Sequence, residues 1–236
     1  MQATLTPELI RKLRSVDTPT ICNALELAMG GRTAQGFTYG NIVAAPQPLP
    51  AIVGFVRTAR IRASAPSLRP PEDVRSMRLD YYRYVADGSA NAPVIVVMED
   101  ADDRPGTGSF WGEVNSALHE GLGVAGVLTN GSVRDLDCLS KSFPILAGSV
   151  GPSHAYVHVE EIGTPVTVFG LELAHGDLIH ADCHGAVLIR PEYLAALPDC
   201  IDLVQRKEAP LLEAVRSGSF SLALLEQAMR DSEDIH

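Results

Sequence analysis

The chain has 236 residues, with 19 Lys and Arg against 29 Asp and Glu, so its formal net charge is −10. This length supports one full hydrophobic core, and 46% apolar with 20% charged residues exclude intrinsic disorder. The acidic balance disfavours nucleic acids and anionic membranes as partners, because both are bound by clustered Lys and Arg.

Two further features bear on location. The first 15 residues lack the apolar segment of a secretory signal, and no apolar run reaches the roughly 18 residues that span a membrane. The four cysteines are widely spaced and form no CxxC motif. We therefore expect a cytoplasmic protein with reduced thiols and no membrane association.

Two helix starts open the chain, at Thr6-Pro7-Glu8 and at Thr18-Pro19, and the second helix is expected to end at Gly30-Gly31. The segment 31–50 is rich in Gly, Pro and Gln and is predicted to be loop. Beyond it, apolar runs predict strands at 51–61, 93–98, 124–129, 145–148, 165–169, 178–181 and 186–189. Helices are expected at 72–86, 111–120, from 135 to about 142, and at 202–206, 208–217 and 221–229.

This alternation predicts a single α/β domain over residues 1–236, with a mixed sheet core, helical flanks and a helical tail from about residue 191. The run Pro93–Met98 is continuously apolar, which is typical of a strand buried on both faces. No shift in composition marks a domain boundary.

The first candidate site is Phe110–Asn115, where Gly112 lets the backbone approach a ligand closely. The peptide N–H groups of Glu113, Val114 and Asn115 lie in the first turn of the predicted helix and lack intrahelical acceptors. Such a helix start can bind a carboxylate or phosphate. The same residues also fit an ordinary helix start, with Glu113 placed favourably for the helix dipole.

The second candidate is Asn130–Asp135, which follows the predicted strand at 124–129. Arg134 is a fork-shaped donor suited to a carboxylate and a neighbouring oxygen, and Asp135 is an oxygen ligand of the kind that Mg²⁺ or Mn²⁺ prefers. A surface ion pair is the plain alternative. Both candidates follow successive strands, so we expect them to meet at one edge of the sheet and bind a 2-oxo acid beside a metal.

Five of the seven histidines fall within residues 154–184: His154, His158, His175, His180 and His184. A zinc site with Cys183 is one interpretation, although no spacing matches a known zinc pattern. A proton-carrying or pocket role for His154 or His184 is another. Gly176-Asp177 and Asp182–Gly185 are interpreted as tight turns between short strands.

A family resemblance rests on the run WGEVNSALHEGLGVAGVLTNGSVRDLD and extends to TPTICNAL, SHAYVH and PVTVFGLELAHGDLIHADCHG. These segments resemble the family named for the regulator of ribonuclease E activity. That family includes 4-hydroxy-4-methyl-2-oxoglutarate and 4-carboxy-4-hydroxy-2-oxoadipate aldolases and oxaloacetate decarboxylases, and was formerly called demethylmenaquinone methyltransferase-like. Asn130 and Asn23 depart from the pattern, since many members carry Asp there.

The resemblance implies a swivelling β/β/α fold, and a homotrimer or homohexamer with active sites between subunits. By position, the backbone amides of Gly112–Asn115 match those that hold pyruvate, and Arg134 matches the arginine that binds and polarises the substrate. Asp135 matches the direct ligand of Mg²⁺ or Mn²⁺, and Glu113 matches the acid that binds this metal through water. His154 is a further candidate for substrate binding.

We therefore expect a class II, metal-dependent lyase, either a pyruvate aldolase or an oxaloacetate decarboxylase. It would cleave a 2-oxo acid such as 4-hydroxy-4-methyl-2-oxoglutarate or oxaloacetate through a pyruvate enolate. Two alternatives stay open. One is a non-catalytic protein that binds and regulates an RNA-degrading enzyme, and the other is an isomerase, dehydratase or hydrolase of a sugar acid on the same metal site.

Overall fold

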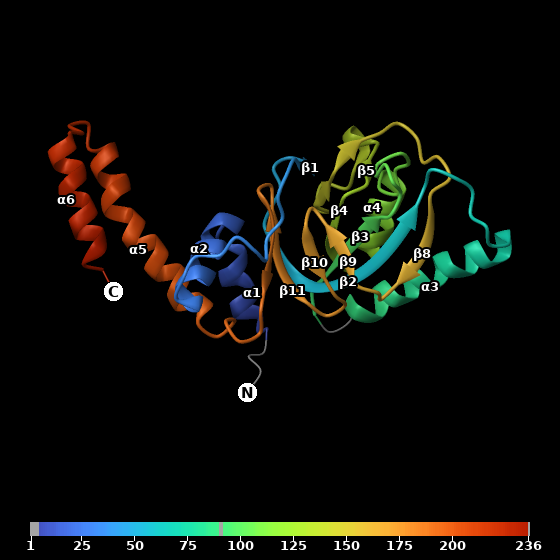
Figure 1. The fold of residues 1–236 in the computed structure, drawn as a ribbon, viewed down its shortest axis with the longest axis horizontal. Coiled ribbons are helices and arrows are strands. Elements are labelled where there is room, and N and C mark those ends of the chain that lie inside the picture. Colours follow the sequence, from blue (N-terminus) through green and yellow to red (C-terminus); the bar gives the residue numbers. More distant parts are fainter. Residues whose placement is uncertain (1–4, 90–91, 236) are drawn as a thin grey trace.

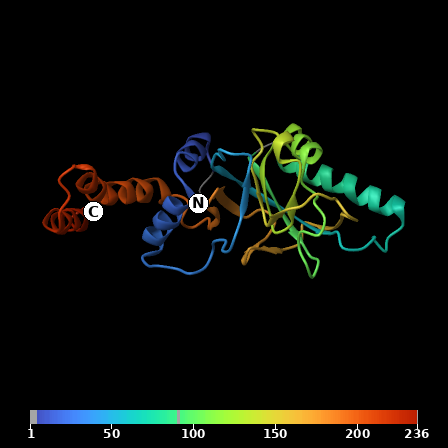
Figure 2. The same cartoon turned by 90° about the horizontal axis from the view of Figure 1, so that it is seen from above.

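A mixed sheet of eight strands forms the centre of the molecule (Figures 1 and 2). The computed structural model describes residues 5–89 and 92–235. The strand order is β1-β6-β4-β3-β2-β11-β12, and β8 pairs with β2 beside this path. The strands are β1 (Val43–Ala45), β2 (Ile52–Arg62), β3 (Val94–Asp100), β4 (Val124–Thr129), β6 (Ile145–Ala147), β8 (His158–Ile162), β11 (Leu178–Asp182) and β12 (Gly185–Ile189).

The parallel strands β2, β3, β4 and β6 carry the core. As the continuous apolar run predicts, both faces of β3 are buried. Val96 and Met98 face the cluster formed with α3 (Pro71–Ser89) and α4 (Glu113–Gly121), whereas Ile95 and Val97 face the hairpin of β9 (Val166–Val168) and β10 (Leu171–Leu173).

β2 gives the sheet its curl, because it pairs with two antiparallel strands along one edge. Its first residues pair with β11, and Ala59–Arg62 pair with β8 across an irregularity between Arg60 and Ile61. Such an irregularity bends a strand and increases its twist. As a result β8 and the segment before it lie over the same side of the sheet as α3 (Figure 1).

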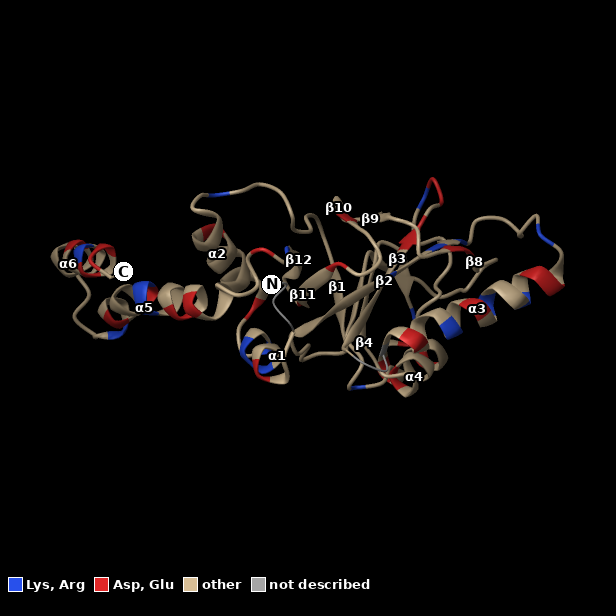
Figure 3. Ribbon diagram, turned by 90° about the horizontal axis from the view of Figure 1, so that it is seen from below, with Lys and Arg blue, Asp and Glu red and all other residues tan. Residues whose placement is uncertain are grey.

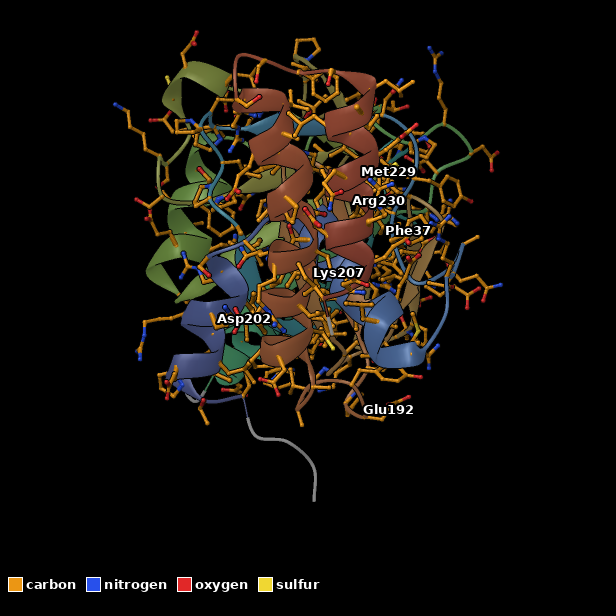
Figure 4. All side chains as sticks on the ribbon, turned by 90° about the vertical axis from the view of Figure 1, so that its left-hand side faces the viewer. Phe37, Glu192, Asp202, Lys207, Met229 and Arg230 are labelled. Carbon is orange, nitrogen blue, oxygen red and sulfur yellow. The ribbon has the colours of Figure 1, made fainter. Side chains whose placement is uncertain are left out.

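The N-terminal helices and the C-terminal tail form the other end of the molecule. α1 (Pro7–Arg14) and α2 (Thr18–Met29) pack with α5 (Leu197–Arg216) against β11 and β12. Lys12 on α1 forms an ion pair with Asp202 on α5. Asp202 is labelled in Figure 4. α5 and α6 (Leu222–Glu233) form a hairpin that extends away from the sheet (Figure 1).

The expected α/β fold with a mixed sheet and helical flanks is confirmed, while several boundaries were predicted wrongly. The sequence did not predict five short strands, because two to five residues carry little periodic signal. These are β1, β5 (Ser132–Val133), β7 (Ser149–Val150), β8 and β10. The helix expected from 135 to about 142 is a 3₁₀ turn at Leu136–Cys138, and the two helices expected at 202–206 and 208–217 form one helix, α5, which continues through Pro210. Along the described part of the chain, none of the helices has the length and apolarity to cross a membrane.

Candidate functional site

The two candidate segments meet beside the carboxyl ends of β3 and β4. These strands are parallel neighbours, so the chain leaves both at the same edge of the sheet. Trp111, just before α4, pairs with Val133 of β5, and the Arg134 N–H donates to the Trp111 carbonyl at 3.0 Å. The prediction that the segments containing Gly112 and Arg134-Asp135 meet at one edge of the sheet is therefore confirmed.

Gly112 is required by this close approach. A Cβ at residue 112 would lie 2.5 Å from Asp135 Oδ2 and 2.9 Å from Arg134 Cγ, whereas the backbone is extended and suits any residue. The glycine therefore serves packing, since it lets the Asp135 carboxylate reach the start of α4. There Oδ2 accepts the Glu113 N–H at 3.2 Å. One of the amides expected to bind a ligand is thus already paired with Asp135.

Arg134 and Asp135 are both held in unfavourable arrangements. Arg134 Nε is buried with no hydrogen-bond acceptor among the described residues, and lies 3.5 Å from Asp135 Oδ2. A buried donor without an acceptor costs about 1–3 kcal/mol. Asp135 adopts a left-handed backbone with φ 55° and ψ 40°, which costs about 1–2 kcal/mol for a residue with a side chain. Strain of this kind gathers at functional sites.

A cavity of about 850 Å³ opens next to this pair. Its walls come from the loop before α3, from α3, from α4 and the two residues Ser109 and Phe110, from Arg134, and from the segment 154–158, which ends at the first residue of β8. Of the predicted site residues, Val114, Asn115, Arg134 and His154 border the cavity. Gly112, Glu113 and Asp135 do not border it, and Asp135 contacts the cavity wall through Arg134.

The charge of the cavity lining differs from that of the whole chain. The lining includes three arginines and two histidines but no Asp or Glu: Arg69, Arg78, Arg134, His154 and His158. Figure 3 shows charged residues gathered on helices and loops, with basic positions along α3. An anion is thus attracted locally in spite of the net charge of −10.

α3 and α4 are joined by a polar network that begins at the cavity wall and continues into the core behind it. The Tyr82 hydroxyl donates to Asn115 Oδ1 at 2.8 Å, and the Asn115 side-chain amide donates to the Phe110 carbonyl. Burial, with a smaller contribution from the Arg78 charge, lowers the pKa of His119 to about 4. The neutral ring donates from Nδ1 to the Asn115 carbonyl and accepts from the Tyr81 hydroxyl, both at 2.6 Å. The Asn115 side chain is therefore engaged within the protein.

Asn130, which departs from the family pattern, has a structural role that an aspartate would fill only in part. Its Oδ1 accepts the Asp100 N–H at 2.7 Å, and its Nδ2 donates to the Asp100 carbonyl at 3.0 Å. A carboxylate can accept but cannot donate. Asp100 in turn accepts the N–H groups of Asp102 and Gly106, so Asn130 helps to fix the loop between β3 and α4.

The five clustered histidines do not converge on one site. His154 and His158 border the cavity, His175 contacts Tyr84, and His180 is buried between Thr18 and Leu13. Among the described residues, one group of three possible metal donors lies within 4.8 Å: Asp182, Cys183 and His184, at the turn between β11 and β12. Asp182 already accepts the N–H groups of Thr18 and His184 there, both at 2.9 Å.

This pairing of Asp182 supports the interpretation of Asp182–Gly185 as a turn. His154, at the cavity, has a backbone partner for one of its ring nitrogens. Its Nδ1 is 2.7 Å from the Ala155 carbonyl, so in the neutral ring Nδ1–H donates and Nε2 is left as an acceptor.

A family model described as RraA-like, Aldolase/RraA, matches residues 18–188. This chain belongs to the RraA-like family. The match includes both strand ends, Gly112 and the Arg134-Asp135 pair, so the resemblance seen in the sequence is confirmed. The family includes both aldolases and RraA proteins. Membership therefore does not by itself decide whether this protein is a catalyst or a regulator.

Relatives of this RraA-like chain agree with its fold. An uncharacterized protein from Methanocaldococcus jannaschii is 31% identical over 112 residues, which are 47% of this chain and 54% of that protein. The chain thus spans about half the length of that relative. The crystal structure of an uncharacterized protein from Pseudomonas syringae pv. tomato is similar with a TM-score of 0.71 and 18% identity, covering 98% of this chain and 96% of that one.

Streptomyces coelicolor RraAS2, described as an unusual member of the RNase ES inhibitor RraA protein family, is similar with a TM-score of 0.62 and 22% identity. The likeness covers 86% of this chain and 93% of that one. At these identities the two solved structures establish a shared fold only.

Sequence reasoning missed the residues that α3 and the preceding loop bring to the cavity: Arg69, Val74, Arg78 and Tyr82. The last three follow a spacing of four residues, which places them on one face of a helix. That spacing was visible in the sequence. Nothing in the sequence showed that this face borders Arg134, because the contact depends on how α3 packs across the sheet.

Proposed function

We propose that this RraA-like protein is a divalent-metal-dependent lyase that cleaves a 2-oxo acid to a pyruvate enolate, by retro-aldol cleavage or by decarboxylation. One observation carries the proposal. The buried Nε of Arg134, which has no hydrogen-bond acceptor among the described residues, lies 3.5 Å from the carboxylate of the strained Asp135, at the wall of a cavity whose charged side chains are all cationic. A small carboxylic acid supplies the acceptor that Arg134 lacks.

The residues present fit a magnesium or manganese ion. Asp135 is 38% exposed, and no described donor forms a hydrogen bond with its Oδ1. Mg²⁺ is commonly held by one or two carboxylates and several waters, so a single Asp with a nearby Glu matches its needs. Asp135 would hold the ion directly and Glu113 would hold it through water. When bound, the ion supplies Lewis-acid stabilisation of negative charge on the substrate's carbonyl oxygen.

The protein's own groups would bind and orient the substrate. The Arg134 guanidinium is planar and presents parallel donors, which suits a carboxylate and an adjacent keto oxygen. As the C3–C4 bond breaks, its electron pair moves into the enolate and charge grows on that oxygen. The other fragment leaves as CO₂ from a carboxylate, or as a carbonyl compound once its C4 hydroxyl has lost its proton to water. The enolate then takes a proton from water at C3 to give pyruvate. A fixed cation at this position stabilises the enolate more than the neutral ketone, which is the condition for faster reaction. Asp135, in turn, limits the movement of Arg134 through its charge at 3.5 Å.

The test is release of pyruvate from oxaloacetate and from 4-hydroxy-4-methyl-2-oxoglutarate with added Mg²⁺ and after EDTA treatment. We expect activity that EDTA abolishes and that Arg134→Ala and Asp135→Ala each lower by at least about 100-fold. Arg75→Ala is the matched control, since Arg75 is exposed on α3 and does not border the cavity. Full activity in the Arg134→Ala and Asp135→Ala variants would refute the proposal.

The same measurements separate the two rival functions. A regulator of an RNA-degrading enzyme would release no pyruvate, and its binding to that enzyme would survive Asp135→Ala. An isomerase, dehydratase or hydrolase would also release no pyruvate, but would act on a sugar acid and lose that activity in the Asp135→Ala variant. The homotrimer or homohexamer and the cytoplasmic location stay predictions, as does the single domain.

A further inference from the structure

The turn between β11 and β12 brings three metal-binding side chains together outside the cavity. Asp182, Cys183 and His184 are consecutive, and one ligand atom of each lies within 4.8 Å of the other two. None of the three borders the cavity, and none has a part in the proposed function. Three consecutive donors match none of the usual zinc spacings. The reversal of the chain at this turn is what places their ligand atoms side by side.

Asp182 is fixed by hydrogen bonds within the protein. Its side chain is 6% exposed. Oδ2 accepts the Thr18 N–H at the start of α2 and Oδ1 accepts the His184 N–H, both at 2.9 Å. Such bonds orient a ligating carboxylate and leave a lone pair of Oδ1 for a cation. Cys183 and His184 are exposed, so an ion can reach the group from solvent.

The spacing of the three ligand atoms fits a tetrahedral zinc ion. Zn–S bonds of about 2.3 Å and Zn–N bonds of about 2.0 Å place sulfur and nitrogen about 3.5 Å apart at a tetrahedral angle. Cys183 Sγ and His184 Nδ1 are 3.6 Å apart. The same geometry places nitrogen and a carboxylate oxygen about 3.3 Å apart, and His184 Nδ1 is 3.1 Å from Asp182 Oδ1. A zinc ion therefore requires little movement of the turn.

A hydrogen bond between His184 and Asp182 explains only part of this arrangement. His184 Nδ1 faces both Asp182 Oδ1 and Cys183 Sγ. A neutral ring has at most one hydrogen on this nitrogen, which can be directed at only one of the two atoms. A cation at the centre of the three atoms interacts with all of them.

The electrostatic surroundings of the turn also favour a cation. The pKa of the Cys22 thiol on α2 is raised to about 11, first by burial and then by the charges of three nearby carboxylates: Glu26, Asp182 and Asp17. The described residues place no Lys or Arg within ion-pair distance of Asp182, whose partner is His184. A cation is therefore attracted to this turn by the local charge.

We propose that this turn is a binding site for a zinc ion, with Asp182 Oδ1, Cys183 Sγ and His184 Nδ1 as ligands and water in the fourth position. A thiolate and an imidazole select Zn²⁺ over Mg²⁺, which prefers oxygen ligands. Binding releases the Cys183 thiol proton to solvent, and the neutral imidazole then carries its hydrogen on Nε2. Because Asp182 also accepts the Thr18 N–H, the ion would tie the β11–β12 turn to the start of α2.

The test is calorimetric titration of the full chain with Zn²⁺, after EDTA treatment and dialysis. Excess Mg²⁺ is present to saturate any site for that ion at Asp135. The wild type is compared with Cys183→Ser, His184→Ala and the control Cys138→Ser. Cys138 is also exposed and lies three residues from Asp135, so the control tests whether a thiolate site forms there instead. Circular dichroism of each variant confirms that it is folded.

We expect the wild type to bind one Zn²⁺ per chain with a micromolar or lower Kd. Loss of an outer-shell partner weakens metal binding about 10–100-fold, so Cys183→Ser and His184→Ala, which remove direct ligands, should each weaken it by at least about 100-fold. Cys138→Ser should behave as the wild type. At 100 times its Kd, Zn²⁺ should raise the Tm of the wild type by about 5 °C. Co²⁺ in place of Zn²⁺ should give a thiolate charge-transfer absorption that Cys183→Ser loses.

Any of four results overturns the inference. They are a wild type without micromolar Zn²⁺ binding, a Kd that Cys183→Ser or His184→Ala leaves within about twofold, a Co²⁺ complex without the thiolate absorption, and loss of binding in Cys138→Ser. None of these measurements follows pyruvate release, which depends on Arg134 and Asp135. The proposed function and the zinc site therefore stand or fall separately.

Discussion

Gly112→Ala is the most direct perturbation of the site, because it adds one methyl group where the structure has no room for it. The new Cβ would lie 2.5 Å from Asp135 Oδ2 and 2.9 Å from Arg134 Cγ. Ordinary contact begins near 3.4 Å, so the carboxylate must retreat by about 1 Å. The backbone of Gly112 is extended, with φ −173°, so alanine causes no backbone strain there.

A displacement of about 1 Å at a reacting geometry can lower the rate about 100-fold, which is about 2.7 kcal/mol in activation free energy. We expect Gly112→Ala to lose activity to this extent and to keep its thermal stability. The assay is Mg²⁺-dependent pyruvate release from oxaloacetate, coupled to lactate dehydrogenase and corrected for spontaneous decarboxylation. Pyruvate affinity is measured alongside by calorimetry.

The matched control is Gly121→Ala at the other end of α4. Nothing lies within 4 Å of a Cβ at that position, and alanine favours a helix over glycine by about 1 kcal/mol. Gly121→Ala should therefore keep full activity with equal or higher stability. A Gly112→Ala variant with activity and pyruvate affinity within twofold of the wild type would refute the reasoning that Asp135 and Arg134 must hold this geometry.

Two further predictions concern stability. Burial lowers the pKa of His119 from 6.5 to about 4, so the unfolded chain binds a proton that the native state excludes as the pH falls below 6.5. Between pH 7 and pH 5 this removes about 2 kcal/mol from the free energy of unfolding. In urea titrations His119→Gln, whose side chain cannot titrate, should lose less stability over the same pH range than the wild type. Equal losses in both proteins would contradict this. Asp182→Asn removes a buried charge that accepts the N–H groups of Thr18 and His184, so thermal unfolding should show a loss of about 1–3 kcal/mol. Pyruvate affinity should not change, since Asp182 does not border the cavity, and a weakened affinity would count against that separation.

The sequence by itself determined the parts that depend on local pattern. The continuously apolar run Pro93–Met98 predicted a strand buried on both faces, and in the structure the side chains of β3 alternate between two cores. Thr6 caps α1 as expected, while the cap of α2 is Asp17, one residue before the predicted start. The meeting of Gly112 with Arg134 also followed from the sequence, because parallel strands end at the same edge of a sheet.

Only the tertiary structure decided what faces the cavity. β8 pairs with the far half of β2, and this pairing brings the segment 154–158 opposite α3. Arg78 becomes a cavity residue because α3 packs over Phe110, and Arg134 borders the cavity whereas Asp135, with its left-handed backbone, does not. A spacing of four residues fixes which side chains share a helix face, but the surface that covers that face is set by contacts between residues far apart in the chain.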